Sequence, residues 1–386
     1  MSTLIGQGSF GCVYYQGITC DGKINLNKKF ASKLQVKDES ALNEINIGKI
    51  IMTLPNYHLF FLPIISSCAV NISTIDKKIW QQCNPIKKYI KEAKQYTPNN
   101  FILSDITYVG ENKTFLTILN DTAYISTKQH LIIALLDNYV YLLEAITLLL
   151  KAHLVHFDIQ SGNIIYDNRS NLPLLLDFGL SIHMDTLNEY NIKEFFYTYS
   201  PDYYVWCLDI HVINYLLHET TAPLTEQDIN SIVTDFVNYN KGLAIFSAEF
   251  KQNYKTTCIN YLRTYVGQEV KKTIDTFITF YPYWDNYSLS VLYLKMFSTI
   301  FSKGFHDNSL IVFFSQVLLH AIHPDPQKRY TVEKTNELFK EIFYVDDNVD
   351  NYVDFITTID YDLDLINQRI KGELQTKKMT RAKKLR

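Results

Sequence analysis

The sequence has no C-x-x-C pair among its six cysteines, which are Cys12, Cys20, Cys68, Cys83, Cys207 and Cys258. Zinc sites usually take their thiolate ligands from such closely spaced pairs, so the spacing gives no reason to expect a zinc site. Scattered cysteines of this kind instead predict reduced thiols in a reducing compartment. No cationic and then apolar leader opens the chain, and we therefore expect a cytoplasmic protein.

Net charge is also small, because 37 basic and 40 acidic residues leave a formal charge of −3. This balance gives no general attraction to nucleic acid or to an anionic membrane, and we expect neither as a partner. The most apolar long run, residues 131–150, carries Asp137 and Glu144. At helical spacing these charges favour a helix in the core of a globular protein over a membrane span. We expect a monomer.

Composition divides the chain into two parts and a tail. Residues 1–108 read mainly as strands and turns, whereas residues 113–345 are mostly helical. A strand-rich part followed by a helix-rich part predicts a bilobal α+β fold, with a small β-rich N-terminal lobe and a larger α-helical C-terminal lobe. Residues 346–386 are acidic and then basic, which is typical of a solvated tail, with a nuclear-targeting or polyanion-binding arm as the alternative.

Three local signals refine this division. The run DESALNEINIGKIIM has apolar residues near helical spacing and capping residues around positions 38–40, so it predicts a helix inside the first lobe. Residues 75–98 form a lysine-rich polar insert between two extended runs. Ser126 and Gln129 are spaced as a capping box, which predicts that a long apolar helix starts there and runs to about Ala152.

A glycine-rich motif, GQGSFG, occupies residues 6–11. This spacing serves two unrelated structures: the Rossmann turn that binds a dinucleotide, and a hairpin that covers the triphosphate of ATP. A Rossmann turn needs a helix straight after the glycines. Here the β-rich run CVYY follows, and Val13 occupies the valine position of the hairpin pattern. The sequence therefore favours the ATP hairpin, in which glycines let backbone amides approach phosphates without a Cβ clash.

Further motifs follow in a fixed order. FASK places Lys33 on a predicted strand beside the hairpin. HFDIQSGN, residues 156–163, has the form H-x-D-x-x-x-x-N, and PLLLDFGL, residues 173–180, is an apolar strand that ends in D-F-G. Each motif alone could be ordinary turn or surface sequence, but chance does not explain all of them in this order and spacing.

Together these motifs resemble the protein-kinase superfamily over roughly residues 4–342. The resemblance implies a kinase domain over residues 1–345, ATP and Mg²⁺ as cofactors, and phosphorylation of protein substrates on serine or threonine. It also implies that the nucleotide is bound by the hairpin residues Ile5, Gly6, Gln7, Gly8, Ser9, Phe10, Gly11 and Val13.

The resemblance gives Lys33 the task of holding the α and β phosphates. In this family a glutamate on the following helix fixes that lysine. Glu44 is our choice, with Glu39 as the alternative. The resemblance further suggests a hinge near residues 107–109, whose backbone would bond the adenine edge.

The catalytic and metal-binding tasks fall on the two later motifs. Asp158 would accept or orient the hydroxyl of the acceptor. Asn163 would hold one Mg²⁺, and Asp177 would bind the Mg²⁺ that bridges the β and γ phosphates. The metal is needed because the charge on the transferring phosphoryl group must be neutralised.

Weaker matches lie downstream. SPD, residues 200–202, resembles the A-P-E that ends the activation segment, and Arg329 would then pair with its acidic residue. An aspartate should brace the catalytic loop from below, and we prefer Asp285 to Asp209 for that role. On that reading residues 203–283 form a helical insertion unusual for the family. Such a divergent chain resembles kinases encoded by large DNA viruses, which adds nuclear and virion-associated locations to the cytoplasmic one.

Two residues depart from the family pattern. Phe157 replaces the arginine that receives an activation-loop phosphate, so that switch should be missing. Gln160 replaces the lysine that touches the γ-phosphate in serine/threonine kinases, and it is our third catalytic candidate after Asp158 and Lys33.

Three functions remain open. An active serine/threonine kinase is favoured, because every other metal and phosphate ligand is present. A weak or inactive kinase-fold scaffold is the alternative that Gln160 suggests. A small-molecule phosphotransferase comes third, because the full glycine motif and D-F-G fit a protein kinase better.

Overall fold

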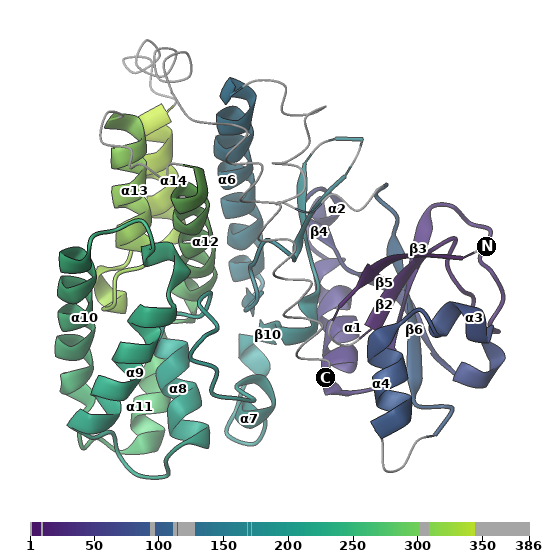
Figure 1. Cartoon of the computed structure of the whole chain (residues 1–386), viewed down its shortest axis with the longest axis horizontal. Coiled ribbons are helices and arrows are strands. Elements are labelled where there is room, and N and C mark those ends of the chain that lie inside the picture. Colours follow the sequence, from purple (N-terminus) through teal and green to yellow (C-terminus); the bar gives the residue numbers. More distant parts are fainter. Residues whose placement is uncertain are drawn as a thin grey trace. The chain divides into compact units, whose positions relative to one another are not determined.

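The structure is a computed structural model, and it describes residues 2–8, 11–92, 97–110, 114, 128–167, 169–170, 172–300 and 309–343. Over these described residues the protein is a mixed α+β structure, 54% helix and 16% strand, with a small β-rich N-terminal region and a helical C-terminal part (Figure 1). The predicted order of a strand-rich and then a helical part is confirmed.

The chain forms two compact units. The first unit contains the residues up to Asn120 together with the segment Gly162–Ser181. The second unit contains the segment that ends at Ser161 and the chain from Ile182 onward. The H-x-D aspartate and the D-F-G motif, although close in sequence, therefore belong to different units.

The first unit is built on a five-stranded antiparallel sheet in the order β1-β2-β3-β6-β5. β1 and β2 form the hairpin at the glycine motif, and β3 pairs with both β2 and β6. In this register Lys33 lies opposite Val13 on one side and Ser104 on the other. The strands are β1 Thr3–Gln7, β2 Gly11–Tyr15, β3 Phe30–Val36, β5 Ile64–Val70 and β6 Phe101–Thr107.

Helix α1, Glu39–Ile51, begins where the sequence predicts it. The Asp38 side chain caps it by accepting a 2.9 Å hydrogen bond from the backbone N–H of Ala41. The lysine-rich insert contains α3, Lys77–Trp80, and α4, Asn84–Glu92. Apolar residues of the insert join sheet residues in one buried cluster, which includes Tyr14, Leu34, Ile79, Cys83, Ile86 and Phe101.

A smaller sheet in the same unit positions the D-F-G motif. Its order is β4-β9-β8, with β8 and β9 as an antiparallel hairpin. Buried Leu62, Ile165 and Leu174 fix this sheet from three strands. The elements are α2 Tyr57–Phe60, β4 Phe61–Leu62, β8 Ile164–Tyr166, β9 Pro173–Leu176 and the 3₁₀ turn η2 Phe178–Leu180.

The second unit is mostly helical. Its strands β7, Leu154–Val155, and β10, Ile182–His183, form a short antiparallel pair. The longest of its helices in the described part of the chain is α6, Lys128–Lys151. The others are α7 Ile192–Phe195, α8 Leu208–His218, α9 Glu226–Tyr239, α10 Ala248–Leu262, α11 Val270–Ile278, α12 Trp284–Ile300, α13 Ser309–Ala321 and α14 Val332–Phe343.

Helix α12 is the core of the second unit. It starts at the predicted D-N-Y-S-L run, and all of its residues except Ser298 are buried. A helix buried on every side lies in the middle of a domain, with other helices around it. Asp285 in its first turn is therefore held in the interior of the unit.

Helix α6 is long and strongly apolar. Its window Ile133–Lys151 could cross a membrane by length and hydropathy, and 56% of that window is buried inside the protein. The Tyr139 ring packs against the rings of Tyr293 and Phe314 at 4.7 and 4.9 Å between centroids. These contacts are those of a core helix, as its charged residues predict. The proposed capping box at residues 126–129 begins outside the described residues.

Four of the six cysteines differ from the expectation of reduced thiols. Cys12 is bonded to Cys83, and Cys20 is bonded to Cys68, with Cα atoms 5.8 and 6.1 Å apart. Cys207 and Cys258 are free and buried. The pairs are 71 and 48 positions apart, so only the folded sheet and insert bring them together. The compartment stays a prediction, although disulfides are more frequent in oxidising compartments.

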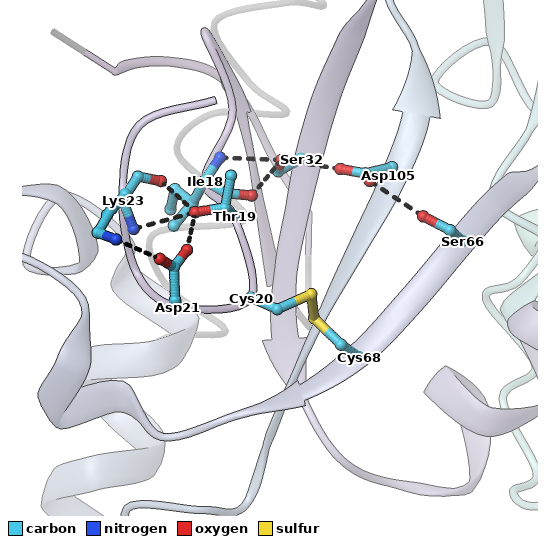
Figure 2. Close-up of a disulfide and its surroundings, with 9 residues drawn as sticks. All are labelled: Ile18, Thr19, Cys20, Asp21, Lys23, Ser32, Ser66, Cys68 and Asp105. Carbon is cyan, nitrogen blue, oxygen red and sulfur yellow. Dashed lines mark hydrogen bonds and ion pairs between the residues drawn. A yellow bond between two sulfur atoms is a disulfide. The ribbon is translucent and has the colours of Figure 1, made fainter. Parts of the chain in front are cut away.

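The second disulfide belongs to a loop that is anchored to the sheet. Figure 2 shows Cys20, in the loop after β2, bonded to Cys68 on β5. Beside it, the Ser32 hydroxyl accepts a 2.9 Å bond from the Ile18 N–H and donates at 3.0 Å to the Ile18 carbonyl. Oδ1 of Asp105, 3.3 Å from the Ser32 Oγ, is a second acceptor for the single proton of this hydroxyl. The chain that follows the glycine hairpin is thus tied to β3, β5 and β6.

Candidate active site

Lys33 is the centre of an ion cluster in the first unit. Its Nζ lies 2.8 and 2.7 Å from the two carboxylate oxygens of Glu44 and 3.2 Å from Oδ1 of Asp177. Of the two glutamates considered from the sequence, the structure thus places Glu44 against Lys33. The three side chains come from β3, α1 and the residue after β9, which are the three motifs expected to serve the nucleotide.

Burial and charge act against each other in this cluster. Burial opposes the charge on Lys33, but the carboxylates of Asp177 and Glu44 outweigh it, so the pKa of Lys33 is raised. Burial raises the pKa of Glu44, and the Lys33 ammonium opposes this effect. The Lys33 ammonium therefore stays charged and fixed in position, as a group that binds phosphate oxygens must be.

The D-F-G segment is fastened to helix α1. Asn43 donates from its side-chain amide to the carbonyls of Gly179 and Ser181 at 3.1 and 2.8 Å, and the Ser40 hydroxyl donates to Gly179 at 3.3 Å. A Cβ on Gly179 would lie 2.6 Å from the Ser40 hydroxyl oxygen, so a side chain here would displace that hydroxyl from its place. Glu44 and Asp177 are thus held on two segments that are bonded together.

Asp177 adopts a backbone conformation that is rare for its type. Its φ of 67° lies in the left-handed region, which non-glycine residues occupy mainly at constrained or functional positions. Among the described residues, the non-glycine residues with positive φ are Gln16, Asn56, His153, Phe157 and Asp177. Two of these belong to the predicted catalytic and metal-binding motifs.

Asn163 and Asp177 carry the oxygen donors that Mg²⁺ prefers. The Asn163 carbonyl accepts a 3.1 Å hydrogen bond from the N–H of Leu176, which joins the start of β8 to the end of β9. Asn163 is buried, and the Asp177 side chain is 38% exposed. No cluster of three or more histidine, cysteine or acidic residues with metal-binding geometry occurs in the described part of the chain. One carboxylate and one amide suit Mg²⁺, which keeps several waters and uses few protein ligands.

The glycine hairpin has the geometry of a tight turn next to Lys33. The N–H of Gly8 bonds the carbonyl of Gly11 at 3.0 Å across the turn, and Ser9 and Phe10 lie outside the described residues. A Cβ on Gly11 would approach the Leu34 carbonyl to 2.4 Å, so glycine is required there for β2 to pair with β3. Ile5, Gly6 and Gln7 belong to β1, and Val13 belongs to β2.

Tyr108, in the middle of the predicted hinge, makes a backbone hydrogen bond and a ring contact. The N–H of Tyr108 donates to the Lys29 carbonyl at 2.8 Å, and the Tyr108 ring stacks on Tyr15 at 3.9 Å between centroids. The Tyr108 amide is therefore engaged within the first unit. A role of residues 107–109 in binding adenine stays a prediction.

In the second unit, Asp285 braces the H-x-D segment. Its carboxylate accepts hydrogen bonds from the N–H groups of His156 at 2.6 Å and Phe157 at 3.0 Å. This is the bracing role for which the sequence favoured Asp285 over Asp209. Because φ of Phe157 is 67°, the brace holds a bulky residue in a conformation that it would otherwise avoid.

Phe157 is held by aromatic contacts. Its ring packs against Phe196, Trp206 and Trp284 at 5.4, 5.1 and 5.9 Å between centroids. Phe196 lies in the segment between D-F-G and S-P-D, which would form the activation loop, and Trp206 lies just after that segment. The segment is therefore attached to the H-x-D segment by apolar packing, which needs no phosphate.

Asp158 is buried, and one of its oxygens is already engaged by two donors. The Gln160 amide donates to Asp158 Oδ1 at 2.8 Å, and the Tyr203 hydroxyl donates to the same oxygen. The Gln160 amide is also 3.2 Å from the Tyr203 hydroxyl. Sequence reasoning missed Tyr203, because it lies 45 positions from Asp158 and the S-P-D run just before it gives tyrosine no task.

The expected partner of Arg329 was wrong. Arg329 bonds Asp209 through Nη1 at 2.6 Å and Nη2 at 3.2 Å, and both side chains are fully buried. Asp202, the acidic residue of the S-P-D run, is exposed instead. A buried guanidinium needs a buried carboxylate, and Asp209 on α8 lies inside the unit whereas Asp202 does not.

No protein-family model matches the chain, and no curated protein sequence is significantly similar to it. Function must therefore be inferred from the residues themselves.

Proposed function

We propose that the chain is an ATP-dependent protein kinase with a fold of the protein-kinase type, which phosphorylates serine or threonine hydroxyls of protein substrates. One observation carries the proposal: Lys33, Glu44 and Asp177 meet in a single ion cluster. Each was given a nucleotide or metal task from its own motif, and Lys33 and Asp177 are 144 positions apart. A cluster that only stabilised the fold would not need to join the strand beside the glycine hairpin to the D-F-G aspartate.

In this function the first unit handles the nucleotide. Lys33 offers its ammonium to the α and β phosphates, and Glu44 keeps it in place. The glycine hairpin offers backbone amides to the phosphates. Asn163 and Asp177 would hold Mg²⁺, which when bound supplies positive charge that neutralises the transferring phosphoryl group.

The second unit handles the acceptor. Asp158 orients the acceptor hydroxyl and receives its proton. The acceptor oxygen forms a bond to the γ-phosphorus while the bond from that phosphorus to the bridging oxygen breaks, and ADP leaves. Asp285 keeps the catalytic loop in shape through its two backbone bonds.

A kinase-fold scaffold without activity is the second candidate. It is favoured by one observation, the engagement of Asp158 Oδ1 by both Tyr203 and Gln160. In an inactive scaffold these bonds would be permanent. In an active kinase the acceptor hydroxyl must be able to take the place of one donor.

The test combines binding with transfer. We expect ATP with Mg²⁺ to raise the melting temperature and NAD to leave it unchanged. Labelled ATP should phosphorylate generic protein substrates on serine or threonine, and a panel of small alcohols should remain unlabelled. Lys33→Met and Asp177→Ala should abolish transfer. Lys37→Met, which removes an exposed lysine just after β3, should keep it.

Each other outcome has a definite meaning. Stabilisation by NAD without ATP would replace the kinase with a dinucleotide-binding protein. Labelling of small alcohols alone would point to a small-molecule phosphotransferase. Binding of ATP with no transfer to any acceptor would support the second candidate, a kinase-fold scaffold without activity.

A further inference from the structure

Tyr203 places a hydroxyl on the carboxylate that is expected to bind the acceptor hydroxyl. The phenol donates to Asp158 Oδ1, and Gln160 completes a triangle of hydrogen bonds between the three side chains. A tyrosine hydroxyl and a serine or threonine hydroxyl are the same kind of donor. Tyr203 therefore makes the contact with Asp158 that a substrate would have to make.

Trp206 connects the Tyr203 ring to the catalytic loop, because it contacts both. The Tyr203 ring meets the Trp206 ring edge-on, with centroids 4.7 Å apart. The Trp206 indole N–H donates at 3.0 Å to the carbonyl of Phe157, the residue before Asp158. The Trp206 backbone N–H also bonds the Tyr203 carbonyl at 3.1 Å. The position of the phenol is thus set by the same loop that carries the aspartate.

The phenol keeps its proton under ordinary conditions. Burial raises the pKa of Tyr203 well above its usual value, and the negative charge of Asp158 raises it further. A neutral phenol can only be a donor towards the carboxylate. The contact is therefore attractive across the range in which proteins work.

We propose that Tyr203 is a specificity-determining residue that competes with the acceptor: its hydroxyl occupies the place on Asp158 that the acceptor hydroxyl needs. This inference rests on the proposed kinase function. A protein substrate displaces the phenol because the rest of the bound peptide contributes further contacts. Water brings no such contacts, so Tyr203 also suppresses the transfer of the γ-phosphoryl group to water.

The suppressed reaction is simple hydrolysis. A water oxygen would bond to the γ-phosphorus as the bond to the bridging oxygen breaks, with ADP and phosphate as products and the water proton passing to Asp158. Removal of the Tyr203 hydroxyl leaves room for that water. The same change removes a competitor of protein substrates.

The experiment uses Tyr203→Phe in the full chain, which keeps the ring on Trp206 and removes only the hydroxyl. Since hydrogen bonds to charged groups are the stronger ones, ATP hydrolysis without a protein acceptor should rise roughly tenfold or more. The KM for a generic protein substrate should fall by a similar factor, with kcat changed less than about threefold. Tyr199→Phe, whose ring packs on Tyr215 instead, is the matched control and should match wild type. If Tyr203→Phe does not fold, Tyr203→Met replaces it.

The outcomes separate this proposal from the function on which it rests. If Tyr203→Phe transfers phosphate and wild type does not, the competition is supported, with the Tyr203 hydroxyl excluding the acceptor completely in wild type. A variant with lower kcat and unchanged KM would show that Tyr203 positions Asp158, and the competition would be overturned. A wild type that phosphorylates protein, with no gain in the variant, would overturn the competition alone. No turnover in any form would overturn the kinase function and the competition together.

Discussion

The carboxylate of Asp285 accepts a 3.0 Å hydrogen bond from the backbone N–H of Phe157, whose φ of 67° places it in the left-handed region. Such a conformation costs about 1–3 kcal/mol and persists only when neighbouring groups hold it. The same carboxylate accepts a second hydrogen bond, from the backbone N–H of His156. The shape of the H-x-D segment thus depends on one buried carboxylate on α12.

This dependence predicts a pH effect on stability. Burial raises the pKa of Asp285 to about 6 from 3.8, although the two backbone bonds lower it. Between these values the folded protein keeps a proton that the unfolded chain releases. The contribution of Asp285 to stability therefore falls as pH rises from 4 to 6, by about 3 kcal/mol in total. The free energy of unfolding, measured with urea at several pH values, should fall more steeply between pH 4 and 6 for wild type than for Asp285→Asn. Parallel curves would contradict it.

Activity should not require phosphorylation of the activation segment. Phe157 meets Phe196 and Trp206 by ring packing where an arginine would need a phosphate. We expect phosphatase treatment to leave the rate of transfer within a few-fold. Phe157→Leu should lower the melting temperature, because it removes the ring packing. Its rate of transfer should still be the same with and without phosphatase treatment. A dephosphorylated protein that is inactive and recovers on rephosphorylation would contradict this expectation.

Gln160 should matter far less than Asp158. A positioned acid–base group contributes about 10²–10⁴-fold, so Asp158→Ala should abolish measurable transfer. Gln160→Ala removes the amide bonds to Asp158 and to the Tyr203 hydroxyl and leaves the Tyr203 donor on the same Asp158 oxygen, so it should slow transfer by about tenfold. Gln160→Lys should hold or raise the rate. If wild type transfers no phosphate and Gln160→Lys does, the natural chain is an inactive kinase.

The disulfides should stabilise the glycine hairpin. Cys12–Cys83 ties β2 to the start of α4, and Cys20–Cys68 ties the following loop to β5. Each should contribute about 2–4 kcal/mol, because each closes a long loop in the unfolded chain. A reductant should therefore lower the melting temperature of wild type and leave a Cys12→Ser, Cys83→Ser, Cys20→Ser, Cys68→Ser variant unaffected. Alkylation of all six cysteines in the oxidised, denatured protein would contradict the pairing.

The sequence by itself determined the order of strand-rich and helical parts and the positions of the main motifs. The cap at Asp38, the strand that carries Lys33 and the helix that begins near Asp285 follow from local rules of capping, alternation and burial. The choice of Asp285 over Asp209 also came from local sequence. These features depend on residues a few positions apart, and the sequence displays such relationships directly.

Only the tertiary structure decided the contacts between distant residues. It paired Arg329 with Asp209 rather than Asp202, paired four cysteines that the sequence shows as scattered, and brought Tyr203 to Asp158. Each contact joins segments at least 45 positions apart, with no spacing rule to connect them. The cause is burial: a buried guanidinium, carboxylate or phenol must find a partner among the groups that packing leaves within reach, and packing is a property of the whole fold.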